Sequence, residues 1–100
     1  MTAVAADLTS RETLAEYDEG VPFPVVYLNG VYAGLTIANE ELVRKGQKPF
    51  FCVARDRTFT PKEIAETFKD FLNPNLDKYG DYPPSVTLYF AFRERFPCAP

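Results

Sequence analysis

The chain of 100 residues contains no histidine and no tryptophan, and it has only two cysteines. Without histidine, the commonest general base and the usual partner of a catalytic cysteine are missing. Zinc sites that combine cysteine with histidine are excluded as well. The spacing of Gly30, Gly34 and Gly46 fits neither the GxGxxG motif nor the Walker phosphate loop. The sequence therefore predicts a protein that is not an enzyme and that holds no metal or cofactor.

Positive charge is also scarce, since the formal net charge is −3. A nucleic-acid partner would require a basic face that releases counterions, so we expect none. No apolar run reaches the roughly 18 residues of a membrane span, and we expect no membrane insertion. The segment 1–6 lacks the basic leader and the long apolar core of a secretory signal. Either the protein is cytosolic, or its natural signal peptide has been removed.

The chain is instead rich in apolar and aromatic residues. Hydrophobic residues make up 46% of the sequence and aromatic residues 15%, all of them Phe or Tyr. This share predicts one globular domain with one core. We expect residues 1–8, which are small and polar, to form a flexible N-terminus, and residues 9–100 to form a single helical domain.

Two helix starts are clearly encoded. Thr9 with Glu12, and Thr60 with Glu63, each have the spacing of a capping box, and Pro61 suits the first position of a helix. Gly20 is placed to end the first of these helices. Asn73-Pro74 is expected to end the helix that begins after Thr60.

A longer helix is predicted from Pro24 to about Lys45, because apolar residues recur there at three- and four-residue steps. Gly30 and Gly34 would share one face of this helix, where we expect them to be packing positions for a neighbouring helix. The competing interpretation is a β-hairpin with its turn at Asn29-Gly30, for which the flanking residues alternate poorly.

A last helix is predicted from a cap at Ser85 to Pro97. The expected fold is thus all-α, a small single-domain bundle of about four helices with one disulfide. The loop before the last helix contains Tyr79, Asp81 and Tyr82, which are candidates for a partner interface. The alternative for the two tyrosines is that their rings fold back over the core.

Cys52 and Cys98 form no CxxC motif, which leaves two interpretations. They are either two separate buried thiols or one disulfide. A cross-link would fix a chain end that otherwise frays, and it would stabilise the fold by roughly 4 kcal/mol on the chain-entropy model. We favour the disulfide and, with it, an oxidising compartment such as a periplasm.

Charged pairs offer little chemistry. Arg55/Arg57 and Arg93/Arg95 could bind anions, although such pairs more often form surface ion pairs. Adjacent carboxylates such as Glu40-Glu41 point about 100° apart on a helix and do not readily share a proton.

Four parts of the sequence together resemble one family. They are segment 27–34 (YLNGVYAG), the Phe51-Cys52 pair, segment 60–72 (TPKEIAETFKDFL), and the end of the chain from Pro84 to Phe96-Pro97-Cys98. In this order they resemble the Rap/Tai family, whose best-known members are immunity proteins of bacterial type VI secretion. The resemblance covers roughly residues 25–98. The chain departs from the family in having no additional N-terminal cysteine and no visible signal peptide.

The resemblance implies a small α-helical fold in which Cys52 and Cys98 are bridged and Gly30 and Gly34 are packing positions. It also implies a periplasmic location after signal removal. Family members bind a secreted peptidoglycan-degrading effector of the amidase type and occlude its active site, and several are dimers. We therefore expect a periplasmic immunity protein with an effector as its partner and a possible homodimer. The alternative is a small periplasmic helical chaperone or stress protein.

Overall fold

The computed structural model describes residues 8–99, and helices account for most of them. The four longer helices are α1 (Ser10–Asp18), α2 (Phe23–Arg44), α3 (Pro61–Leu72) and α5 (Pro84–Arg95). A 3-10 turn, η2 (Asn73–Asn75), and the single turn α4 (Leu76–Tyr79) connect α3 to α5. The part of the chain that is described contains no strand, so the all-α prediction is confirmed and the hairpin alternative is wrong. The predicted flexible segment 1–8 lies outside the described residues except for Leu8.

Both predicted capping boxes are present. The backbone N–H of Glu12 donates to Thr9 Oγ1 at 3.1 Å, and the N–H of Thr9 donates to the Glu12 carboxylate at 2.9 Å. The same exchange joins Thr60 and Glu63, at 3.1 and 2.8 Å. Each box satisfies two amides that the first turn of a helix leaves without partners. The starts of α1 and α3 therefore follow from local sequence alone.

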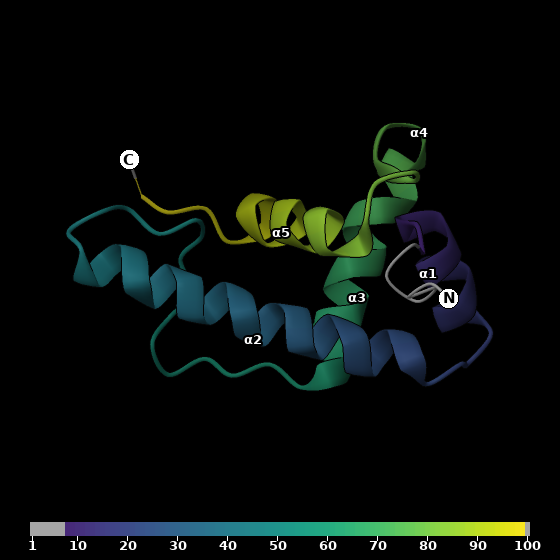
Figure 1. Ribbon diagram of the computed structural model, residues 1–100, viewed down its shortest axis with the longest axis horizontal. Helices are drawn as coiled ribbons and strands as arrows, with labels where there is room; N and C mark the ends of the chain where they lie inside the picture. The colour runs from purple at the N-terminus through teal and green to yellow at the C-terminus, as the bar shows by residue number, and fades with distance from the viewer. Residues whose placement is uncertain (1–7, 100) are drawn as a thin grey trace, which may run out of the picture.

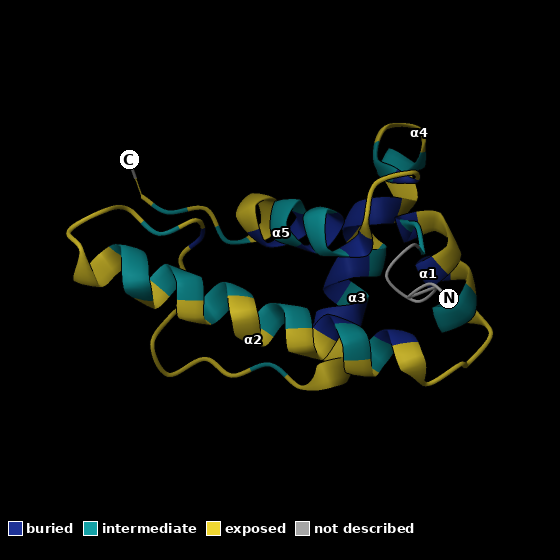
Figure 2. Ribbon diagram, in the orientation of Figure 1, coloured by how far each residue is buried: buried dark blue, intermediate teal, exposed yellow. Residues whose placement is uncertain are grey.

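Helices α2 and α5 lie side by side and run in the same direction, while α3 crosses both of them (Figure 1). Their C-terminal ends consequently lie at one end of the molecule, and α1 and α4 lie at the other end. The buried residues are concentrated on α3 and on the sides of α2 and α5 that face it (Figure 2). The largest fully buried apolar side chains are Leu28, Ile64, Phe68, Leu72, Leu88 and Phe92.

An aromatic cluster fills the core between α2, α5 and the segment that joins α2 to α3. Its centre is Phe92, which is fully buried. The Phe92 ring lies 4.8 Å from the ring of Tyr32, 5.3 Å from that of Phe51, and 5.5 Å from those of Phe59 and Phe96, measured between centroids. Rings at these distances add to the stability gained from burial alone. The cluster thus holds the connecting segment against the helices.

A buried polar contact joins α1 to the start of α5 at the opposite end. Ser10 Oγ lies 2.6 Å from Thr87 Oγ1 and also donates to the carbonyl of Tyr82 at 2.8 Å. The backbone N–H of Ser10 donates to the same carbonyl, and that of Arg11 donates to the carbonyl of Gly80 at 2.9 Å. These bonds satisfy amides at the N-terminus of α1 and fix that helix to the loop between α4 and α5.

Two further predictions about helix ends have different outcomes: one is wrong and one is confirmed. Ser85 does not cap the last helix, because α5 begins two residues earlier than predicted, at Pro84, with Pro83 in the cap position and no side-chain cap. Proline in the first turn has no N–H that needs a partner, which makes a side-chain cap less necessary. Asn73-Pro74 ends α3 as predicted, since α3 stops at Leu72 with Asn73 as its C-cap, and the separate short elements η2 and α4 follow.

The predicted packing role of Gly30 and Gly34 is wrong within this chain. Both residues are exposed, and a Cβ atom built on either would meet no atom within 4 Å apart from the adjacent residues and the nearby backbone of α2 itself. Apolar residues lie all around α2, and the helix buries a different stripe, which includes Leu28 and the half-buried Val31 and Leu35. The two glycines therefore face away from the core.

Replacing both glycines with alanine is expected to stabilise the protein. Glycine inside a helix costs about 1 kcal/mol relative to alanine, and there is open space for each new methyl group. We expect Gly30→Ala and Gly34→Ala each to raise the free energy of unfolding by about 0.5–1 kcal/mol in urea titrations. Gly46→Ala is the control and is expected to destabilise, because Gly46 has a φ of +77°. A loss of stability in the first two variants would restore a packing role.

Candidate functional site

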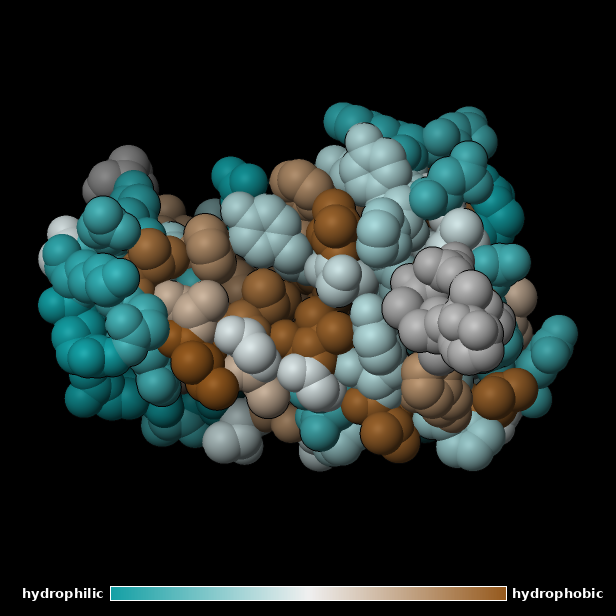
Figure 3. Space-filling model, in the orientation of Figure 1, coloured by the Kyte–Doolittle hydropathy of each residue, from teal (hydrophilic) through white to brown (hydrophobic). Residues whose placement is uncertain are grey.

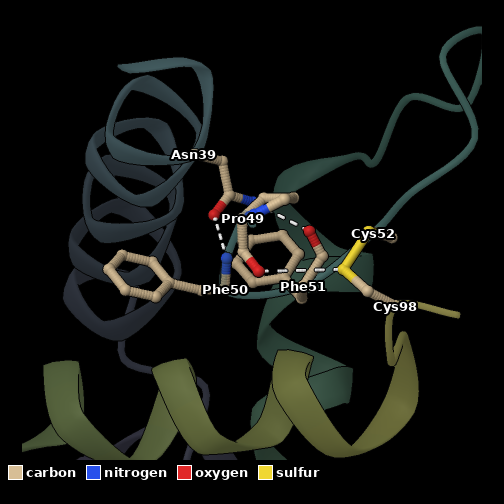
Figure 4. Close-up of a disulfide and its surroundings, with 6 residues drawn as sticks. All are labelled: Asn39, Pro49, Phe50, Phe51, Cys52 and Cys98. Carbon is tan, nitrogen blue, oxygen red and sulfur yellow. Dashed lines mark hydrogen bonds between the residues drawn. A yellow bond between two sulfur atoms is a disulfide. The ribbon is translucent and has the colours of Figure 1, made fainter. Parts of the chain in front are cut away.

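Cys52 and Cys98 form a disulfide with an S–S distance of 2.02 Å, which confirms the favoured prediction. The bond joins the segment between α2 and α3 to the chain beyond α5, across 46 residues of sequence (Figure 4). It therefore closes the end of the molecule at which α2 and α5 terminate. Disulfides persist in oxidising compartments, and this one is consistent with a location outside the cytoplasm.

The segment 47–57, which we call the linker, is also held to α2 by Asn39. The Asn39 amide donates to the carbonyl of Phe51 at 3.1 Å and accepts the N–H of Phe50 at 2.8 Å (Figure 4). Next to these bonds, the N–H of Cys52 donates to the carbonyl of Phe96 at 2.8 Å. Within the apolar run 49–53, only Phe51 is buried. The linker is a fixed surface segment with one ring inserted into the core.

An open groove of about 650 Å³ lies between the C-terminal half of α2 and the linker. We call it the linker groove. It is lined mainly by apolar groups, with polar side chains among them. The residues that line it on the α2 side include Tyr32, Thr36, Asn39, Val43 and Arg44, and those on the linker side include Phe51, Val53, Arg55 and Arg57.

Two arginines, Arg55 and Arg57, line the linker side of the groove. The guanidinium of Arg57 lies over the ring of Phe59 at 4.5 Å and near that of Phe96 at 5.5 Å. Arg57 also lines a smaller groove of about 300 Å³ beside α3. Neither Arg55 nor Arg57 forms an ion pair with any residue that the structure describes. Tyr32 and Arg57 line the same groove and both lie against the ring of Phe59; burial raises the pKa of Tyr32, while the charge of Arg57 acts to lower it.

The predicted interface residues Tyr79, Asp81 and Tyr82 lie at the opposite end of the molecule. Tyr79 folds back onto the core, with its ring 5.1 Å from that of Phe71 and 5.4 Å from that of Phe90. Asp81 is exposed and lies 3.8 Å from Arg11. Tyr82 is 42% exposed. Two of the three side chains are thus accessible, and their contact with a partner remains a prediction.

Apolar side chains also reach the surface on α2. Val26 is 68% exposed and Ile37 63%, on the face that carries Gly30. Figure 3 shows hydrophobic residues gathered over α2 and α5 in the middle of the view, and hydrophilic residues around the end where α2 terminates.

No helix in residues 8–99 has the length and apolar character needed to cross a membrane. The described residues also contain no group of side chains arranged to hold a metal ion.

The most strongly perturbed ionisable group is Tyr17, which joins α1 to α3. Tyr17 donates to the carboxylate of Glu66, and burial together with this bond raises the pKa of Tyr17 to about 12. Beside it, Lys69 donates to Asp18 at 2.8 Å, and this hydrogen bond raises the pKa of Lys69. These contacts fasten one helix to another, which is a structural role.

No family model, curated protein or solved structure matches this chain.

Proposed function

We propose that this protein is a periplasmic immunity protein that binds a secreted peptidoglycan-degrading effector of the amidase type and occludes its active site. The single observation that carries the proposal is the disulfide between Cys52 and Cys98. It closes a rigid helical scaffold next to an open groove and agrees with a protein that works outside the cytoplasm. The resemblance to the Rap/Tai family supplies the class of partner.

A rigid surface suits this task. An inhibitor that is ordered before binding loses less conformational freedom when it meets its target, so more of its contact energy appears as affinity. Here the linker is fixed by the disulfide, by Asn39 and by the ring of Phe51. The exposed apolar residues of α2 offer further contact area for the effector or for a second copy of the chain.

Titration of the oxidised protein against a purified amidase effector encoded beside its gene tests this proposal. We expect saturable binding in calorimetry with a dissociation constant in the nanomolar range, about −12 kcal/mol. We also expect loss of hydrolysis of purified peptidoglycan at equimolar inhibitor. If a catalytically normal effector keeps its full activity when this protein is added in excess, the proposal is contradicted.

A small periplasmic chaperone is the second candidate, and the exposed side chains Val26 and Ile37 favour it. Such a protein would protect many unrelated clients from aggregation at pH 2–3, where loss of carboxylate charge weakens pairs such as Lys69–Asp18. Broad protection without selective binding of an effector would support this candidate, and selective binding alone would support the immunity protein.

A further inference from the structure

The linker groove carries positive charge that the fold itself does not use. Three arginines, Arg44, Arg55 and Arg57, and one acidic residue, Glu40, line the groove, although the whole protein has a net charge of −3. Arg44 is paired with Glu41 near the end of α2, where a cation also suits the helix dipole. Arg55 and Arg57 lie on the linker, between the end of α2 and the start of α3. Neither forms an ion pair with any residue among 8–99.

The side chain of Arg57 is held in place before any partner arrives. Its guanidinium rests on the rings of Phe59 and Phe96, an arrangement that leaves its hydrogen-bond donors free for a carboxylate. Tyr32 lines the same groove and also packs against Phe59, with ring centroids 5.6 Å apart. A cation from the linker side and a phenol group from the α2 side therefore line the same groove.

The dimensions of the groove suit a segment of extended chain. Its α2 wall runs from Tyr32 to Arg44, which corresponds to about 18 Å of helix. An extended peptide of about five residues spans the same length. Val43, which is 58% exposed, and the half-buried Val53 give apolar contacts along the way.

We propose that the linker groove binds an extended acidic segment of the target protein, with carboxylates facing Arg55 and Arg57 and apolar side chains lying against Tyr32 and Val43. This inference rests on the proposed function, since it names the surface that meets the effector. It places the contact at the disulfide end of the molecule, away from the loop of Tyr79 and Tyr82.

Charge-reversal variants of the full chain, titrated against the same amidase effector, test the placement. We expect Arg57→Glu and Arg55→Glu to weaken binding by about tenfold or more, mostly at low salt, because close charge pairs set both affinity and association rate. Arg55 is exposed and lies in a turn, so its variant remains informative if Arg57→Glu folds poorly. The matched control is Lys78→Glu on α4, an exposed site beside the Tyr79 loop, and its affinity should stay within about twofold.

A second measurement separates failure of this inference from failure of the proposed function. Two capped pentapeptides, Asp-Leu-Asp-Val-Glu and Lys-Leu-Lys-Val-Lys, are titrated into labelled protein and followed by amide chemical shifts. We expect the acidic peptide alone to shift Tyr32, Val53 and Arg57. If the amidase does not bind but these shifts occur, the groove is supported and the amidase partner is wrong. Amidase binding that survives both arginine variants, or absence of shifts together with absence of amidase binding, would overturn the inference.

Discussion

Replacing Cys52 and Cys98 with alanine is expected to lower the free energy of unfolding by about 4 kcal/mol. The disulfide spans 46 residues, and closing a loop of this length removes many conformations from the unfolded chain. Cys52 is exposed and Cys98 half-buried, so the substitutions leave little empty volume behind. A domain of this size has a stability of roughly 5–15 kcal/mol, of which this is a large share. Equilibrium unfolding in urea measures the loss directly.

The matched control for the double variant is the reductant itself. Reduced wild-type protein and the alanine variant should unfold at similar urea concentrations, and reductant should leave the variant unchanged. A loss smaller than about 1 kcal/mol would mean that Asn39 and the ring of Phe51 hold the linker without the covalent bond.

Truncation of Phe92 to alanine should destabilise the protein by a similar amount, about 3–5 kcal/mol. Phe92 is fully buried and is surrounded by the rings of Tyr32, Phe51, Phe59 and Phe96. Loss of its ring removes apolar burial and leaves a cavity at the point where α2, α5 and the linker meet. Thermal unfolding followed by circular dichroism gives the change in stability.

Two further variants keep this measurement interpretable. Phe92→Leu retains most of the buried volume and should cost about 1–1.5 kcal/mol, which remains measurable if the alanine variant does not fold. Phe50→Ala changes a ring that is 39% exposed and contacts Tyr89 at 5.2 Å. Its cost should be about 1 kcal/mol. Equal losses at positions 50 and 92 would show that the aromatic cluster is not the centre of the core.

Local rules predicted most of the helices because the signals lie within a few residues of each other. Thr9 and Thr60 start their helices as expected, and Gly20 and Gly46 follow helix ends with φ values of +85° and +77°. The face of α2 that is buried was not predictable in this way. Val26 and Ile37 are as apolar as Val31 and Leu35, and only the placement of α3 and α5 decides which pair is covered.

Only part of the candidate site was predictable from the sequence. Arg55 and Arg57 were considered as anion contacts or surface ion pairs, but nothing in the sequence placed them opposite the C-terminal half of α2. Residues 32, 36, 39 and 43 recur at helical spacing and mix polar with apolar side chains, a pattern that indicates a half-exposed stripe. That this stripe faces the linker depends on the disulfide and on the Asn39 hydrogen bonds, which join residues distant in sequence.

Helix α5 is anchored at its two ends by different chemistry. Hydrogen bonds among Ser10, Thr87 and Tyr82 hold its beginning, and the sulfur bridge holds the chain just beyond its end. A newly made chain whose thiols are still reduced would keep the first anchor and lack the second. The linker would then be held only by the hydrogen bonds of Asn39 and by the buried ring of Phe51, so its side of the groove would be fixed less firmly before oxidation.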